Sequence, residues 1–333
     1  MWSDDAVGAS TEETTSARLE RLRGVAVSGA AQFGLEAASL DLVLHGFNTT
    51  FALRTPDGLR AAVRVNTNSL SRREHVAAQH AWQSALLADT DVLVPDPLST
   101  LDGEPVATVP LDGREHLVVA TSWLDGPDVE DCDVEQARAL GRVMATMHGH
   151  AHGWQPPAGT GLPTADEPLL GERDQLTGSD LLDEGGRAVV VEAMQRAAEV
   201  FAATSARLPR IAVHGDLHGG NLKWHEGRLA VFDFDDALMG TTALDLATAT
   251  FYVRDAPEVE EALWAGYAEV ATPPDLGPDE LDALLAGRQL LLATSLLTTT
   301  TEAFAAMAPE YLERTVARLR HWLAGHRFVL DPD

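Results

Sequence analysis

Residues 211–236, with the sequence IAVHGDLHGGNLKWHEGRLAVFDFDD, carry the pattern that decides the fold. A short apolar run opens the stretch and predicts a buried strand, which a polar, glycine-rich segment follows. Two further apolar runs on either side of a glycine turn predict a β-hairpin. Because a hairpin of this length reverses the chain, Asp233 is expected to return beside Asp216 and Asn221. The stretch therefore predicts two carboxylates and one amide oxygen that face a common point.

Such an arrangement suits the transfer of a phosphoryl group. One carboxylate can orient and deprotonate an attacking hydroxyl, and oxygen atoms are the ligands that Mg²⁺ prefers beside nucleotide phosphates. In protein kinases, the Asp and Asn of the catalytic loop and a later Asp divide these tasks. By the same division, Asp216 is expected to be the base, and Asn221 and Asp233 the Mg²⁺ ligands.

The order of these residues resembles the signature H-G-D-x-x-x-x-N, followed by a hydrophobic-Asp pair, of the aminoglycoside phosphotransferase family. That family includes choline kinases, type II homoserine kinases and a bacterial stress-response kinase. The continuation FDDALMG at 234–240 and DLA at 245–247 also follows its pattern. The resemblance implies a protein-kinase-like, two-lobed α+β fold, with ATP and Mg²⁺ as cofactors and a nucleotide between the lobes. It also implies that Asp245 is a buried support for the catalytic loop.

Two other interpretations of this stretch stay open. The alternation His214-x-Asp216-x-His218 is compatible with a metal hydrolase, because His and Asp side chains at alternate positions can chelate zinc. No helical H-E-x-x-H spacing supplies further ligands nearby, which argues against it. The chain could instead be a catalytically silent nucleotide-binding module, although it retains all of the predicted catalytic side chains.

The composition bounds the partners and the location. The chain has 333 residues, of which 24 are basic and 51 acidic, and its formal net charge is −27. Such a surface repels nucleic acid, and its excess of carboxylates favours a cationic or neutral acceptor over an anionic one. The N-terminus lacks a basic-then-apolar leader and no run of eighteen apolar residues exists, so we expect a cytoplasmic protein without a membrane partner. The one cysteine, Cys132, stands between Asp131 and Asp133, which should raise its pKa, so we do not interpret it as a nucleophile.

The first third of the chain predicts the smaller lobe, at 17–122. Residues 1–16 are polar and acidic and are expected to be disordered, and apolar positions at helical spacing follow at 17–34. An amphipathic helix is expected at 71–87. Five β-prone runs predict an antiparallel sheet, and they lie at 40–44, 50–54, 59–65, 105–110 and 115–122.

The resemblance implies that this lobe holds the nucleotide phosphates. The loop 45–50 would cover them, with Asn48 and Thr49 as candidate residues, although a single glycine makes it a poor version of a kinase loop. Arg64 stands where kinases carry a strand Lys and would bind the phosphates bidentately. Glu74, ten residues further on, would orient Arg64 from the helix.

The larger lobe is expected at 123–333, where helical spacing dominates. The segment 121–126 resembles the family's hinge, whose backbone contacts adenine, and Ser122 and Leu124 are the candidate residues there. The Pro- and Gly-rich residues 153–186 predict a long loop, a region that often contributes to the acceptor site in this family. Helices are expected at 134–150, 187–208, 244–252, 259–270, 278–307 and 309–328.

These features predict an enzyme that uses ATP and Mg²⁺ to phosphorylate a hydroxyl of a small molecule, such as an amino alcohol, a sugar or an aminoglycoside-like compound. A protein Ser/Thr kinase of the stress-response type is the alternative, because the FDDALMG run looks most like the stress-response and homoserine kinase branch. Asp235 and Asp236 lie beside the expected metal site. There they could meet a cationic acceptor, and Asp235 could equally assist the metal.

Overall fold

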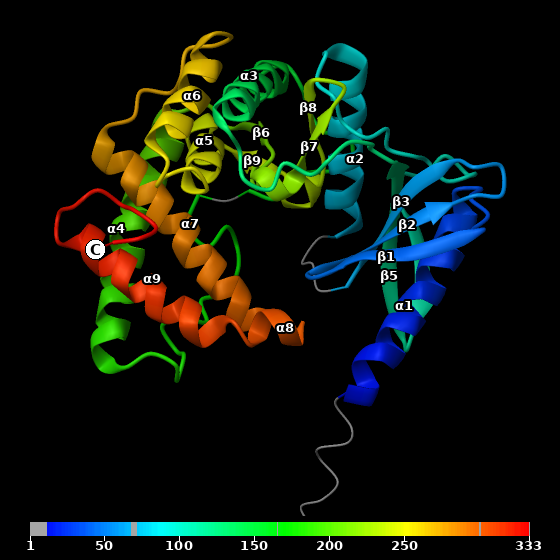
Figure 1. Cartoon of the computed structure of the whole chain (residues 1–333), viewed down its shortest axis with the longest axis horizontal. Coiled ribbons are helices and arrows are strands. Elements are labelled where there is room, and N and C mark those ends of the chain that lie inside the picture. Colours follow the sequence, from blue (N-terminus) through cyan, green and yellow to red (C-terminus); the bar gives the residue numbers. More distant parts are fainter. Residues whose placement is uncertain (1–11, 68–71, 165, 300, 333) are drawn as a thin grey trace, which may run out of the picture. The chain divides into compact units, whose positions relative to one another are not determined.

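A computed structural model describes residues 12–67, 72–164, 166–299 and 301–332 (Figure 1). The chain forms two compact units, residues 1–77 with 95–123, and residues 78–94 with 124–333. Of the segment predicted to be disordered, residues 1–11 lie outside the described part, whereas residues 12–16 begin helix α1 (Glu12–Gln32). Once a helix has formed, each added residue gains a hydrogen bond, and a helix therefore extends into a polar segment.

The first unit contains the predicted antiparallel sheet of five strands, in the order β1-β2-β3-β5-β4. Alternate residues of β2 and β3 are buried, as in a sheet with one covered face, and α1 packs across β3, β4 and β5. Phe51, Val63 and Val118 are in the core between helix and sheet. The strands are β1 (Ser39–His45), β2 (Asn48–Arg54), β3 (Arg60–Asn66), β4 (Ala107–Leu111) and β5 (Arg114–Ser122).

Helix α2 (Arg73–Asp89) is shared between the two units, which differs from the limits predicted at 17–122 and 123–333. Its residues from 78 onward, together with the chain as far as 94, belong to the second unit, and the remaining boundary falls after Trp123. Trp82 explains this assignment, because it is fully buried and its ring meets Phe234 edge to face at 5.6 Å between centroids. A helix joins the unit in which its apolar face is buried.

The second unit is mainly helical, as predicted. The predicted hairpin is present as β7 (Leu222–His225) and β8 (Arg228–Val231), and β6 (Ile211–Val213) pairs with β9 (Leu238–Gly240). The predicted helix 278–307 is interrupted, because α7 ends at Thr298. The helices are α3 (Val134–Ala151), α4 (Glu184–Arg207), α5 (Thr242–Phe251), α6 (Pro257–Ala268), α7 (Pro278–Thr298), α8 (Glu302–Ala305) and α9 (Ala308–Leu323).

Helices α3 and α6 lie side by side at a distance that only glycine allows (Figure 1). A Cβ atom on Gly141 would lie 2.0 Å from the main-chain oxygen of Leu263, and one on Gly266 would lie 2.0 Å from that of Arg138. Neither position can take a side chain unless the main chain moves, because the interior is close-packed.

We expect Gly141→Ala to reduce the free energy of unfolding by about 1–3 kcal/mol, the usual effect of overpacking. Gly149 provides the matched control in the same helix, since nothing lies within 4 Å of its Cβ position. Gly149→Ala should leave stability unchanged or raise it by up to about 1 kcal/mol, because Ala favours the helix. Urea denaturation measures both variants, and equal effects would contradict the close approach.

Helix α7 is a long apolar helix of the second unit. It has the length and mean hydropathy of a membrane-spanning helix, but 67% of its most apolar window is buried inside the fold. Its buried residues include Asp282, Arg288 and Gln289. Arg288 connects this helix to the stretch 211–236, where it contacts Asp216.

Candidate active site

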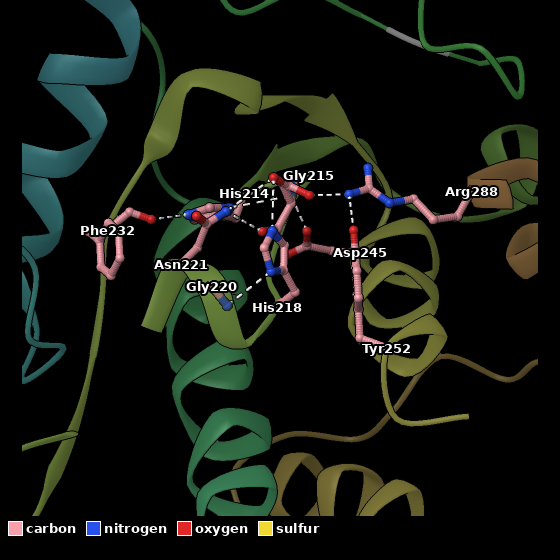
Figure 2. A network of polar contacts seen from close by, with 10 residues as sticks. His214, Gly215, His218, Gly220, Asn221, Phe232, Asp245, Tyr252 and Arg288 are labelled. Atoms are coloured by element: carbon pink, nitrogen blue, oxygen red, sulfur yellow. Dashed lines mark hydrogen bonds and ion pairs between the residues drawn. The ribbon is translucent and has the colours of Figure 1, made fainter. Parts of the chain in front are cut away.

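The polar loop between β6 and β7 is anchored by a fully buried carboxylate. Asp245 of α5 accepts a hydrogen bond from the main-chain N–H of Gly215 at 2.7 Å (Figure 2). It accepts a second one from His148 Nε2 at 2.9 Å. His148 Nδ1 lies 2.9 Å from the hydroxyl of Tyr267, which donates to it. Burial by itself raises the pKa of Asp245, but these hydrogen bonds and the neighbouring histidines lower it overall. The ionised carboxylate therefore holds the loop by its backbone.

We expect Asp245→Asn to lower the free energy of unfolding by roughly 2 kcal/mol. Asn has the same size but replaces one acceptor oxygen with an NH₂ group, which then faces the donor on Gly215 or on His148. A buried donor left without an acceptor costs about 1–3 kcal/mol. Chemical denaturation measures the change. Asp275→Asn at an exposed position is the matched control, and it should change stability by less than about 0.5 kcal/mol. Equal values for the two variants would contradict the anchoring role.

Two glycines bring other parts of the chain against this loop. Gly215 has a φ of +81°, and a Cβ atom there would lie 2.5 Å from the main-chain oxygen of Asp236. A Cβ atom on Gly219 would lie 1.4 Å from the main-chain oxygen of Glu130. Only glycine permits backbone segments to approach this closely. The segment that carries the later carboxylates therefore lies directly beside the loop that carries Asp216.

His214 supports the loop and is not exposed to a ligand. Its Nε2 donates to the main-chain oxygen of Phe232 at 3.1 Å, and its Nδ1 accepts the N–H of Asp216 at 3.4 Å. Burial lowers its pKa despite the neighbouring carboxylates, so the imidazole is neutral. Within the described part of the chain, no three His, Cys, Asp or Glu side chains are grouped to hold a metal ion. Both observations argue against the zinc interpretation.

Asp216 and Asn221 are in direct contact. Asn221 Nδ2 donates to the main-chain oxygen of Asp216 at 2.8 Å and to its Oδ2 at 3.1 Å. His218 Nε2 lies 3.5 Å from the same carboxylate oxygen. Because the amide nitrogen of Asn221 faces Asp216, its amide oxygen is the atom left to meet another ligand.

Arg288 is a partner of Asp216 that the sequence analysis missed. Its Nη2 donates to Asp216 Oδ1 and, at 2.6 Å, to the hydroxyl of Tyr252 (Figure 2). Burial by itself raises the pKa of Asp216, but the charge of Arg288, followed by the contributions of His218 and His214, outweighs it and lowers the pKa to about 2. Asp216 is therefore ionised at neutral pH, as a group that accepts a hydroxyl proton must be.

Asp233 follows the hairpin immediately. The N–H of Phe232 donates to the main-chain oxygen of Asn221 at 3.1 Å, so the hairpin returns the chain beside Asn221. Asp233 itself has a φ of +63°. Residues other than glycine adopt this left-handed conformation at a cost, although Asp tolerates it better than most, and such residues cluster at functional sites.

Asp236 has an unusual electrostatic environment. Burial, and then the carboxylates of Asp216, Asp233 and Glu172, raise its pKa to about 7, while the charge of Arg288 acts in the opposite direction. The side chain nevertheless reaches solvent, so the repulsion by the neighbouring carboxylates is the more important cause. Negative charge is in excess on this side of Asp216.

The residues predicted to bind the nucleotide lie mainly in the first unit. Asn48 Oδ1 accepts the N–H of Thr67 at 3.3 Å, and Arg64 is half-buried in β3. Thr49 is fully buried, and its hydroxyl lies 2.9 Å from His45 Nδ1. Any contact of Thr49 with a nucleotide would therefore be made through its backbone.

The remaining predicted residues have other local contacts. Glu74 Oε1 lies 3.5 Å from Arg72 Nη1 in an exposed ion pair. Ser122 Oγ accepts the N–H of Asp96 at 2.8 Å, and Leu124 is half-buried at the start of the second unit. The nucleotide-binding roles of these residues stay predictions.

Cys132 is a partly buried thiol. Burial, followed by the negative charges of Asp133 and Asp131, raises its pKa to about 11. The thiol is protonated at neutral pH and is a poor nucleophile.

Comparison with known sequences identifies relatives of this chain. The model of the phosphotransferase enzyme family matches residues 42–284. Amicoumacin kinase of Bacillus subtilis is 28% identical over 158 residues, which cover 45% of this chain and 44% of that protein. The chain spans about half the length of the curated relatives it matches.

Solved structures share the same architecture. A microcompartment-associated aminopropanol kinase has a TM-score of 0.75 and 23% identity, covering 93% of this chain and all of that one. An amicoumacin kinase in complex with AMP-PNP, Ca²⁺ and Ami has a TM-score of 0.67 and 17% identity, covering 92% of this chain and 96% of that one. These similarities confirm the kinase-like fold.

Proposed function

This chain belongs to the phosphotransferase enzyme family, and we propose that it transfers the γ-phosphoryl group of ATP to a hydroxyl of a small molecule. The contact between Asp216 and Asn221 is the observation that carries the proposal. In this contact the ionised carboxylate of Asp216 lies beside the amide of Asn221, whose oxygen would be a metal ligand. The hairpin returns the chain at Asp233 to the same point. A base and two oxygen ligands for a metal are the groups that phosphoryl transfer requires.

Asp216 would hold the acceptor hydroxyl by a hydrogen bond and align its oxygen with the γ-phosphorus. As the new P–O bond forms and the bond to ADP breaks, the hydroxyl proton passes to the carboxylate. A carboxylate with a pKa near 2 is a weak base. Its main contribution is therefore orientation, and the proton is transferred late, which suits the loose transition state of this reaction.

Asn221 and Asp233 fit a divalent cation by the type of their donor atoms. The amide nitrogen of Asn221 is committed to Asp216, which leaves its oxygen for the cation, and Asp233 supplies a carboxylate. Oxygen ligands suit Mg²⁺, which we propose as the physiological ion. The related amicoumacin kinase structure holds Ca²⁺ together with an ATP analogue, which supports the use of a divalent cation with the nucleotide. When bound, Mg²⁺ would neutralise phosphate charge.

The acceptor would carry a cationic group. Asp236 and Glu172 both have a raised pKa, for which burial is the largest cause, and the carboxylate of Asp216 adds to it at Asp236. A cation placed here would relieve the repulsion between these carboxylates. The names of two relatives, aminopropanol kinase and amicoumacin kinase, support a small-molecule acceptor, in the first case an amine.

Thermal denaturation with ATP, GTP and ADP, each with Mg²⁺ and with EDTA, tests the nucleotide site. A ligand that binds only the folded protein raises its Tm, by the equivalent of about 2.7 kcal/mol at a hundred times Kd. We expect ATP with Mg²⁺ to raise the Tm and ATP with EDTA to have a much smaller effect. If no nucleotide raises the Tm, the proposal is wrong.

A further inference from the structure

Arg288 has more hydrogen-bonding capacity than the fold uses. A guanidinium group carries five N–H donors, and only those of Nη2 bind other side chains, those of Asp216 and Tyr252. Nε is buried and finds no acceptor among the described residues, and Nη1 donates to none of them either. The side chain is only 8% exposed. A cation this deeply buried normally has all of its donors satisfied.

Arg288 lies beside the point at which the acceptor hydroxyl would bind. Arg288 contacts Oδ1 of Asp216, the carboxylate that would hold the acceptor hydroxyl. Tyr252 fixes the guanidinium from the other side, since its hydroxyl accepts from Nη2 and its ring centroid lies 5.5 Å from the guanidinium carbon. Arg288 is therefore held between Tyr252 and the catalytic loop (Figure 2). Because Nε is fully buried, a group on the acceptor close to its hydroxyl would meet the N–H donors of Nη1.

We propose that Arg288 binds a carboxylate of the acceptor, and that the acceptor is a small hydroxy amino acid. This inference rests on the proposed function of the same site. A guanidinium binds carboxylates in a defined planar geometry, which makes Arg suited to this recognition.

Glu172 supplies the opposite charge. Its carboxylate accepts a hydrogen bond from Ser295 Oγ at 3.0 Å. Ser295 lies seven residues after Arg288 on α7, which places both residues on the same face of the helix. One face of α7 therefore carries the cation Arg288 and binds the carboxylate of Glu172 through the hydroxyl of Ser295. Asp236 adds a second carboxylate on the side of the catalytic loop.

A zwitterion satisfies both sets of charges, whereas simpler acceptors satisfy one. A purely anionic acceptor would be repelled by Glu172 and Asp236. A purely cationic amino alcohol would leave the donors of Arg288 without an acceptor. An acceptor with a carboxylate and an ammonium group near its hydroxyl matches Arg288 on one side and the carboxylates on the other.

The test compares acceptors that differ by one charged group. Serine, ethanolamine and hydroxypropanoate form one set, and homoserine, aminopropanol and hydroxybutanoate form a longer one. We measure kcat and KM for each from ADP release. The wild-type protein should prefer the hydroxy amino acid over the amino alcohol of the same set by roughly ten- to a hundredfold in kcat/KM, the effect of one charge-assisted hydrogen bond. In Arg288→Gln this ratio should fall to about one.

Arg318→Gln is the matched control, because it removes another partly buried arginine, one that binds Gln289 and the main chain at Leu330. It should keep the wild-type ratio. A merely structural role of Arg288 would lower kcat/KM for both acceptors by the same factor, and an unchanged ratio in Arg288→Gln would overturn the proposal. A wild-type preference for the amino alcohol would overturn it as well, while phosphoryl transfer itself would stand.

The nucleotide measurements separate a failure of acceptor recognition from a failure of phosphoryl transfer. Both variants should keep the Mg²⁺-dependent rise of Tm with ATP, which shows that they are folded and bind the nucleotide. If the wild-type protein neither binds a nucleotide nor phosphorylates any acceptor, the proposed function fails, and the inference fails with it.

Discussion

Asp216→Asn should reduce phosphoryl transfer by about three orders of magnitude and leave the affinity for ATP nearly unchanged. General-base catalysis contributes roughly 10²- to 10⁴-fold, and Asn cannot accept a proton. In the wild type, N–H donors of Asn221 and Arg288 bind the carboxylate of Asp216. The amide of the variant presents an NH₂ group to these donors, so the acceptor hydroxyl also loses its alignment. Steady-state ADP release with a phosphorylated acceptor measures the loss.

The control for this variant concerns folding, because Asn at 216 leaves the buried charge of Arg288 without its partner. Circular dichroism should show that the variant is folded, and the Tm rise with ATP and Mg²⁺ should show that it binds the nucleotide. Turnover within threefold of the wild type, in a protein that passes both controls, would rule out Asp216 as the base.

Asp233→Ala should abolish the Mg²⁺-dependent part of nucleotide binding. The substitution removes a carboxylate ligand, and Mg²⁺ is held by few protein oxygens, so each one matters. We expect the Tm rise with ATP and Mg²⁺ to fall to the value measured with EDTA, and turnover to fall below detection.

Asp233→Asn is the matched control for the backbone. Residue 233 has a positive φ, which Asn tolerates and Ala does not, so the Ala variant also loses some stability without a ligand. The Asn variant keeps one ligand oxygen and should retain the stability of the free protein with a weakened response to Mg²⁺. An undiminished Mg²⁺-dependent rise in Asp233→Ala would mean that the metal is held elsewhere.

Local sequence patterns predicted most of the elements. Apolar alternation with Gly-containing turns predicted the sheet of the first unit and the hairpin of β7 and β8, because those signals depend on neighbouring residues. The strand β9 was not predicted, since three residues carry no periodicity. The sharing of α2 between units depends on what Trp82 packs against, which its own helix does not encode.

Arg288 shows why part of the site escaped prediction. It lies 72 residues from Asp216 and belongs to none of the motifs, and their contact follows from how α7 packs beside α5. One signal could have found it. Arg288 interrupts the apolar sequence LLAGRQLLLA, and an arginine buried in such a helix requires a carboxylate partner.

The interaction of Asp236 with Glu172 escaped prediction for a related reason. Its place beside the expected metal site could be inferred from its sequence position, but its interaction with Glu172 depends on the long loop before α4. A loop without periodicity gives no information about which of its carboxylates comes close to the site. Sequence reasoning could therefore propose a base, metal ligands and a place for Asp236 beside the acceptor, but it could not include Glu172, and the roles of these residues stay predictions.

Phosphorus NMR of the complete reaction shows directly whether this protein transfers a phosphoryl group to a hydroxyl. The wild-type protein is incubated with ATP, Mg²⁺ and the two sets of acceptors, with Asp216→Asn in parallel. We expect signals of ADP and a new phosphate monoester to grow with the wild type, and neither to grow with the variant. Unchanged ATP, or release of inorganic phosphate without any monoester, would contradict the assignment of this protein as a kinase of small hydroxyl compounds.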